Sequence, residues 1–187
     1  RAALAAAVRQ LLDVLEPWVY STDGRGLEEV VGDQLRERGL SIAVAESCTG
    51  GLLASRLTDV PGSSDYFDRG VVCYSNGAKI EWLGVSPDLL AEHGAVSEPV
   101  ARAMADGVRQ RARAGVGVGI TGIAGPGGGT AEKPVGMVCI AVVTPWQEDV
   151  RTFQFLGPRD MVKFQSAQAA MNMLRLLLAD GPPVYRD

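Results

Sequence analysis

The fold is decided by residues 42–51, which read IAVAESCTGG. The first four of these residues form a short apolar run that predicts a buried strand. The two glycines at the end allow a sharp turn into a helix. A strand that passes through a short loop into a helix is the building unit of α/β proteins. We therefore interpret the rest of the chain as an alternation of strands and helices.

This alternation continues on both sides of residues 42–51. Strands are expected at residues 42–45, 70–74, 116–120, 137–143 and 151–156. Helices are expected between Leu27 and Gly39, from Thr49 to before Pro61, from Asn76 to Trp82, and after Ser97 and Asp160. Residues 137–143 are apolar throughout, which predicts a central strand covered on both faces. The late strands follow one another without a helix, which predicts an antiparallel portion. The expected fold is α/β, a three-layer α/β/α sandwich with a mixed, largely parallel sheet.

Residues 1–24 stand apart from this pattern. Leu4, Val8, Leu11 and Leu15 recur at helical spacing, and residues 21–26 (STDGRG) have the composition of a linker. We expect an N-terminal helix and linker at 1–24, the tail of a missing upstream region, and the main domain at 25–187. The chain does not begin with Met, so we expect a fragment of a longer protein.

The composition excludes several classes of function. The 187 residues include 18 Lys and Arg against 22 Asp and Glu, a net charge of −4, and the sequence has no Lys/Arg runs. Both observations argue against a nucleic-acid binder, which normally has a basic face. No apolar run approaches the roughly 20 residues that span a bilayer. The single histidine, His93, excludes any site that needs two imidazoles. Three scattered cysteines without a CxxC pair predict neither a zinc site nor disulfides, and they favour a reducing cytoplasm.

Chemistry is expected where strands end in small polar residues, because ligands gather at such ends in open α/β sheets. The first of these ends carries Ser47, whose neighbouring helix-start amides suit an oxyanion or a phosphate. Alternatively, Ser47 or Thr49 is only a helix cap. Cys48 is the rival nucleophile, since a thiol at a helix start can be activated. Glu46 is expected to be a structural acceptor under the turn.

The second strand end carries Lys79, which follows residues 74–78 (YSNGA). With Asn76 as the cap, Lys79 falls in the first helical turn, where the helix dipole opposes a cation by about 0.3–1 kcal/mol. That lowers the pKa by well under one unit, whereas a lysine base near neutrality needs a decrease of about three units. Burial must supply the rest. The alternative is a solvated lysine on a surface helix.

The third strand end is rich in glycine and reads TGIAGPGGGT over residues 121–130. It lacks the GxGxxG and Gly-Lys-Ser/Thr patterns, and a strand follows it, so a dinucleotide or triphosphate site is disfavoured. The glycines are expected to wrap a small ligand or else to form a flexible connection. Arg159, just before the final helix, either clamps a phosphate or lies in solvent.

These motifs together resemble those of the CinA C-terminal domain family, which includes bacterial nicotinamide mononucleotide deamidases. The resemblance covers about Leu27 to Ala179, and it is carried by AVAESCTGG (residues 43–51), PGSS (61–64), YSN (74–76) with Lys79, HGAVS (93–97) and TGIAGP (121–126). The segment before it looks like the end of the middle region of full-length CinA. The upstream CinA domain would then be a partner within the same protein.

The resemblance implies an amidohydrolase that converts nicotinamide mononucleotide to nicotinic acid mononucleotide and ammonia without a metal or other cofactor. The family's nucleophile falls on Ser47, its base on Lys79 and its assisting tyrosine on Tyr74. Substrate handling falls on Ser64, Thr121 and Arg159, to which we add Thr49, Gly50 and Gly122. The resemblance also suggests a homodimer. The alternative function is a non-catalytic nucleotide-binding or regulatory module of a competence- or damage-inducible protein.

Overall fold

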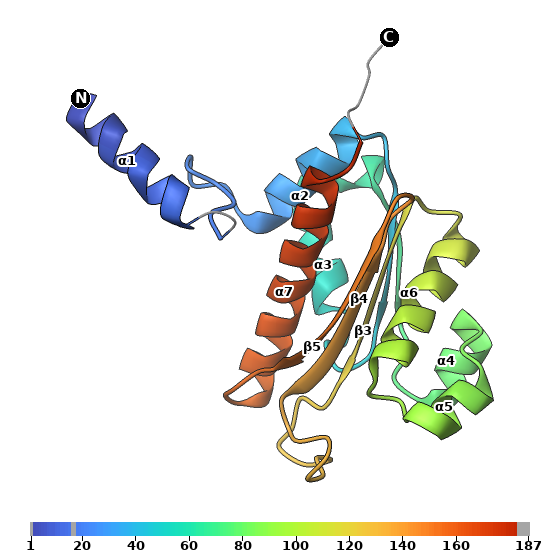
Figure 1. Ribbon diagram of the computed structural model, residues 1–187. Helices are drawn as coiled ribbons and strands as arrows, with labels where there is room; N and C mark the ends of the chain where they lie inside the picture. Colours follow the sequence, from blue (N-terminus) through green and yellow to red (C-terminus); the bar gives the residue numbers. More distant parts are fainter. Residues whose placement is uncertain (1, 16–17, 183–187) are drawn as a thin grey trace.

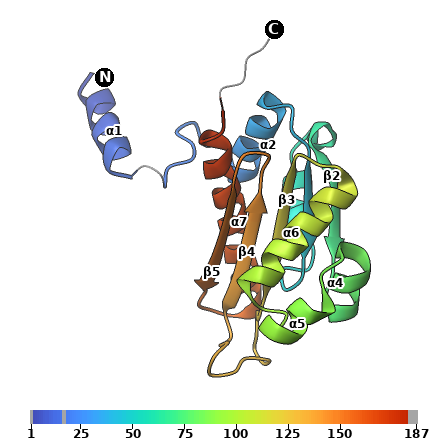
Figure 2. The same ribbon diagram turned by 45° about the vertical axis from the view of Figure 1, so that its right-hand side comes forward.

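The computed structural model describes residues 2–15 and 18–182. Between residues 27 and 179 it has helices on both faces of one sheet (Figures 1 and 2). The strands are β1 (Ile42–Glu46), β2 (Phe67–Val72), β3 (Val116–Gly122), β4 (Met137–Val143) and β5 (Glu148–Gln154). The helices are α1 (Ala2–Leu15), α2 (Leu27–Glu37), α3 (Leu52–Thr58), α4 (Asn76–Leu83), α5 (Pro87–His93), α6 (Glu98–Ala112) and α7 (Arg159–Ala179), with a short 3₁₀ helix η1 at Ser63–Asp65.

The sheet has the order β2-β1-β3-β4-β5. Strand β1 pairs in parallel with both β2 and β3, whereas β4 runs antiparallel to β3 and to β5. Four strands therefore point the same way and β4 is reversed, which confirms the mixed sandwich and its antiparallel portion. Strand β4 is a buried interior strand and β5 is an edge strand, as predicted, although β5 covers residues 148–154 instead of 151–156.

The two faces of the sheet build separate cores because successive side chains of a strand point to opposite faces. Even-numbered residues such as Val44 and Ile140 pack with α2, α3 and α7, whereas odd-numbered residues such as Ala45 and Ala141 face α4 to α6. The apolar runs in β1, β3 and β4 follow from this burial on both sides.

Helix α6 lies against β3 with almost nothing between the two main chains. A Cβ on Gly119 would come within 2.2 Å of the Ala101 carbonyl oxygen, and one on Gly117 within 2.3 Å of that of Ala105. On another side of α6, a Cβ on Gly107 would come within 2.1 Å of the carbonyl oxygen of Leu83, the last residue of α4. These three glycines permit the close approach of α6 to both neighbours.

Some predicted boundaries are wrong. Strand β2 covers residues 67–72 instead of 70–74, because its pairing with β1 begins at Phe67. Helix α4 is capped by Ser75, whose Oγ accepts a hydrogen bond from the Ala78 amide at 3.1 Å, and not by Asn76. Helix α7 begins at Arg159 after Pro158, so Asp160 lies inside its first turn and is not the cap.

The N-terminal helix forms as predicted, and both views show it standing clear of the sandwich (Figures 1 and 2). Leu4 and Leu11 are exposed, so the apolar stripe of this helix is not covered by the described part of the chain. Among the described residues, no helix combines the length and the apolar character needed to cross a bilayer.

Candidate active site

The three predicted strand ends meet around one cavity of about 260 Å³. The carboxyl ends of β1 and β3 adjoin there, because Glu46 pairs with Ile120 in the parallel register. The cavity is lined by residues from all three strand ends, from the loop before α6 and from the start of the last helix: Ser47, Cys48, Tyr74, Asn76, Lys79, Ala95, Val96, Thr121, Gly122, Ile123, Ala124, Gly125, Gly127, Gly128 and Arg159. Its size is near the lower end for small-molecule sites. Such a cavity suits a small ligand and not a folded partner.

Ser47 follows β1 directly, and hydrogen bonds of its own amide and of the neighbouring Glu46 fix the turn that contains it. Its amide donates to the Ile120 carbonyl at 2.9 Å. The buried Glu46 carboxylate accepts hydrogen bonds from the amides of Gly51 (3.1 Å), Leu53 (3.1 Å) and Ala54 (2.8 Å). Glu46 is thus the structural acceptor under the turn, as predicted, and it occupies the amides that begin α3. The Cys48 amide lies in the preceding turn, and Cys48 borders the cavity, so this amide is left for an oxyanion.

Lys79 lies inside the molecule, which excludes the solvated alternative. Only 1% of this residue is exposed, and its Nζ lies 3.2 Å from Ser47 Oγ. The carbonyl oxygens of Cys73 and Tyr74 lie 2.9 Å and 3.4 Å from Nζ. Desolvation lowers the Lys79 pKa from its ordinary value of 10.5. Because Ser75 is the cap, Lys79 lies one position further from the helix start than expected, and burial is the main cause of the decrease.

The carbonyl arrangement around Lys79 also orients the amine. A neutral amine has two N–H groups and one lone pair. If the N–H groups donate to the carbonyls of Cys73 and Tyr74, the lone pair faces the Ser47 hydroxyl. This is the geometry that a general base needs in order to accept the hydroxyl proton.

Cys48 is a poor rival to Ser47. The thiol is 5% exposed, and burial raises its pKa to about 12. A thiolate is the reactive form of cysteine, and at neutral pH this side chain remains a thiol. The geometry therefore favours the serine hydroxyl as the nucleophile.

Tyr74 and Arg159 form one wall of the cavity. Arg159 donates through Nη2 to the Tyr74 hydroxyl at 2.8 Å and through Nη1 to the Gly125 carbonyl at 2.9 Å. Arg159 has no carboxylate partner in residues 2–15 and 18–182. Its uncompensated charge, at the start of the long helix α7, favours an anion at this wall. The main-chain carbonyl of Tyr74, and not its hydroxyl, is the group close to Lys79.

Thr121 and Gly122 also border the cavity, at the end of β3. The Thr121 hydroxyl donates to the Ala95 carbonyl at 2.8 Å, which ties the end of β3 to the loop that precedes α6. A ligand that contacts Thr121 would use the lone pairs of this hydroxyl as acceptors.

Three predicted substrate-binding residues do not line the cavity. Thr49 is fully buried, and its hydroxyl has no hydrogen-bond partner among the described residues. Gly50 lies on the outer side of the turn, where a Cβ would be 3.5 Å from Lys163 Nζ. Ser64 lies in η1, which precedes β2 and is therefore near the amino ends of the strands, opposite the cavity. Substrate contact by these residues stays a prediction without geometric support in this chain.

Asn76 is a cavity residue that the sequence does not indicate, because its side chain is expected to cap the helix. Ser75 takes that role, and Asn76 borders the cavity at the first position of α4. The run Tyr-Ser-Asn offers two adjacent cap residues, so the sequence carries no signal for choosing between them. Within the described residues, no group of three or more His, Cys, Asp and Glu side chains is placed to hold a metal ion.

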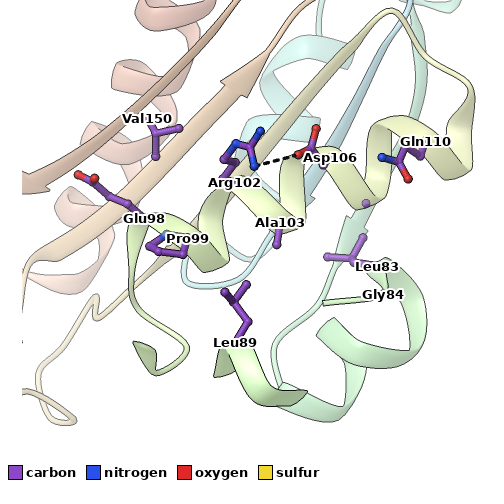
Figure 3. A pocket seen from close by; sticks show the side chains of 11 residues that line it. Leu83, Gly84, Leu89, Glu98, Pro99, Arg102, Ala103, Asp106, Gln110 and Val150 are labelled. Atoms are coloured by element: carbon purple, nitrogen blue, oxygen red, sulfur yellow. Dashed lines mark ion pairs between the residues drawn. The ribbon is translucent and has the colours of Figure 1, made fainter. Parts of the chain in front are cut away.

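A larger cavity of about 570 Å³ lies elsewhere, between α6, the α4–α5 connection and β5 (Figure 3). Its charged groups already have partners, since Arg102 pairs with Glu148 at 2.8 Å and Asp106 at 3.9 Å, and Glu98 accepts from Thr152 at 2.8 Å. No serine, threonine, cysteine or lysine is among the residues that line this cavity. The smaller cavity beside Ser47 is therefore the candidate active site.

Comparison with known proteins finds similar sequences over most of the chain. Residues 24–178 match the family model described as the CinA C-terminal domain. A CinA-like protein from Syntrophobacter fumaroxidans is 59% identical over 159 residues, which cover 85% of this chain and 38% of that protein. One from Mycolicibacterium paratuberculosis is 54% identical over 184 residues, 96% of this chain and 42% of that protein. The chain thus spans about two fifths of the length of these relatives.

Solved structures show the same fold. A competence/damage-inducible protein from Agrobacterium tumefaciens is 40% identical with a TM-score of 0.77, and the match covers 83% of this chain and 98% of that one. A CinA superfamily protein from Klebsiella pneumoniae 700603 is 35% identical with a TM-score of 0.78, covering 83% and 99%.

Proposed function

This chain belongs to the CinA C-terminal domain family, and from that membership and the geometry of its site we propose that it is an amidohydrolase that acts on nicotinamide mononucleotide. The products would be nicotinic acid mononucleotide and ammonia. The observation that carries the proposal is the buried Lys79 amine, 3.2 Å from the Ser47 hydroxyl. The names of the relatives refer to CinA and to competence or damage induction, and they name no reaction.

The first half of the proposed reaction forms an acyl-enzyme. Neutral Lys79 takes the Ser47 proton, and the serine oxygen attacks the carboxamide carbon. The Cys48 amide, at the edge of the cavity, would stabilise the resulting oxyanion, because Glu46 occupies the amides of Gly51, Leu53 and Ala54. The Lys79 ammonium returns its proton to the amide nitrogen as the C–N bond breaks, and ammonia leaves.

The second half removes the acyl group. Lys79, neutral again, takes a proton from water, whose oxygen attacks the ester carbon. The proton then passes to Ser47 Oγ as the C–O bond breaks and the acid is released. The main-chain carbonyl of Tyr74 lies close to Lys79 Nζ, and the Tyr74 hydroxyl accepts a hydrogen bond from Arg159. We therefore assign Tyr74 the role of orienting both Lys79 and Arg159.

The phosphate of the substrate is assigned to Arg159. Its guanidinium keeps N–H groups beyond the two that bond Gly125 and Tyr74, and its planar fork suits phosphate oxygens. The start of α7 adds the positive end of a helix dipole at the same wall. We also propose, from the family resemblance, a cytoplasmic location, an upstream CinA domain and a homodimer. Light scattering on the full-length protein tests the homodimer.

The direct test is ammonia release from nicotinamide mononucleotide by purified protein. Wild type should release ammonia, Ser47→Ala should reduce the rate to background, and Cys48→Ala should keep most of it. Loss of activity in Cys48→Ala with activity kept in Ser47→Ala would assign the nucleophile to the thiol. Binding of the nucleotide by wild type without turnover would instead support a regulatory nucleotide-binding module.

A further inference from the structure

The loop between β3 and β4 forms one side of the candidate active site. Gly125, Gly127 and Gly128 of this loop border the cavity. Glycine has no side chain to fix a loop by packing, and it loses more backbone entropy on ordering than other residues. The loop therefore needs to be anchored by residues outside the glycine cluster.

Lys133 supplies such an anchor. Its Nζ donates to the carbonyl oxygen of His93 at 2.6 Å and to that of Val96 at 2.7 Å. These carbonyls belong to the end of α5 and the turn before α6, about 40 positions earlier in the chain. Val96 borders the cavity itself, so the two bonds connect one side of the cavity to another.

The Lys133 ammonium bonds two main-chain carbonyls and does not form an ion pair among the described residues. Lys133 forms no salt bridge within the described part of the chain, and its side chain is half-buried. Hydrogen bonds from an ionised donor are shorter and stronger than neutral ones, which suits an ammonium for holding two main-chain carbonyls. Thr121 adds a parallel bond to Ala95, between the two carbonyls that Lys133 holds.

The anchored loop in turn holds Arg159, which donates to the carbonyl of Gly125. We propose that Lys133 is a positioning residue that fixes the glycine loop against residues 93–96 and thereby places Arg159 for the anionic group of the substrate. This proposal rests on the proposed function of the site. Ser47 directly follows β1 and Lys79 lies in α4, both outside the loop, so their arrangement does not depend on Lys133.

The separation of these two parts predicts a split between binding and chemistry. Lys133→Met, which keeps the apolar stem and removes the donors, should raise KM for nicotinamide mononucleotide about fivefold or more, because a loosened loop misplaces Arg159. The value of kcat should stay within about twofold, and its pH dependence should not move. Lys133→Arg, which keeps the charge and the donors, should restore most of the lost affinity. Glu132→Gln is the control, since Glu132 is exposed on the same loop and makes no bond to residues 93–96.

Hydrogen exchange of the substrate-free protein tests the anchor independently of turnover. Amides of residues 124–130 should exchange faster in Lys133→Met than in wild type and Glu132→Gln, with unchanged exchange in β1 and β4. Unchanged loop exchange, or a fall in kcat with KM unmoved, would overturn the proposal. If wild type releases no ammonia, the proposed function fails, and the exchange comparison together with nucleotide binding by the two variants still decides the role of Lys133. If Lys133→Met does not fold, Lys133→Gln replaces it in both measurements.

Discussion

Replacing Lys79 with Met tests the central claim that this amine is uncharged in the folded protein. Burial lowers the folded-state pKa below 10.5, the ordinary value that the unfolded chain has. Between these two pKa values the unfolded state binds one more proton than the folded state. The free energy of unfolding of the wild type must therefore rise with pH in that interval, by about 1.4 kcal/mol per pH unit from this residue alone.

The variant lacks this dependence because Met does not titrate. Below the folded-state pKa the wild type carries the full cost of a buried ammonium, and that cost disappears as the pH rises towards 10.5. Lys79→Met should thus gain stability relative to wild type at low pH and lose that advantage with increasing pH. Urea unfolding of both proteins at several values from about pH 6 to about pH 9 gives the difference directly.

Activity provides the second measurement on the same variant. A positioned general base contributes about 10²- to 10⁴-fold, so Lys79→Met should reduce ammonia release by at least that factor. Lys79→Arg should fail as well, since a guanidinium holds its proton near neutrality. Parallel stability–pH curves for wild type and Lys79→Met would show that Lys79 is equally protonated in both states, and the proposed base would have to be abandoned.

Three further changes test the surroundings of the site. Glu46→Gln should lower the free energy of unfolding by about 2–4 kcal/mol in urea, because a neutral amide replaces a carboxylate that accepts from three main-chain N–H groups; a loss under about 0.5 kcal/mol would contradict this. Cys48 should resist alkylation by iodoacetamide at about pH 8, since burial raises its pKa to about 12, and rapid labelling of the native protein would refute that. Gly107→Ala should destabilise by about 2 kcal/mol or more despite the helix propensity of Ala, because the new methyl would lie 2.1 Å from the Leu83 oxygen; a raised melting temperature would show that α4 can move away.

The sequence predicts the fold well where strands are buried on both faces. Residues 137–143 are apolar at every position, and they form the central strand β4. Prediction is poorer at the sheet edge, where β2 begins with Phe67, Asp68 and Arg69 and carries little periodicity. Its extent follows from pairing with β1, which is a tertiary property that local pattern does not contain.

The sequence predicts which residues form the site better than it predicts their burial and their hydrogen-bond partners. Strand ends and glycines point to Ser47 and to the loop after Thr121, and both border the cavity. The depth of Lys79 is not visible locally, because its helix is only eight residues long and its burial comes from packing on α6 and beside β1. The bonds of Lys133 join residues about 40 positions apart, and no spacing rule anticipates them.

The glycines of α6 and β3 bear on how this domain can diverge. Layers separated by side chains shift gradually as those side chains are exchanged, but main chain touching main chain leaves only one workable spacing. Helix α4, which carries Lys79, contacts α6 in this way, and so does β3, the neighbour of the strand β1 that leads to Ser47. Helix α6 therefore sets the positions of both elements, and we expect substitutions at these three glycines to alter the distance between Lys79 Nζ and Ser47 Oγ more than substitutions on the outer faces of α2 and α7.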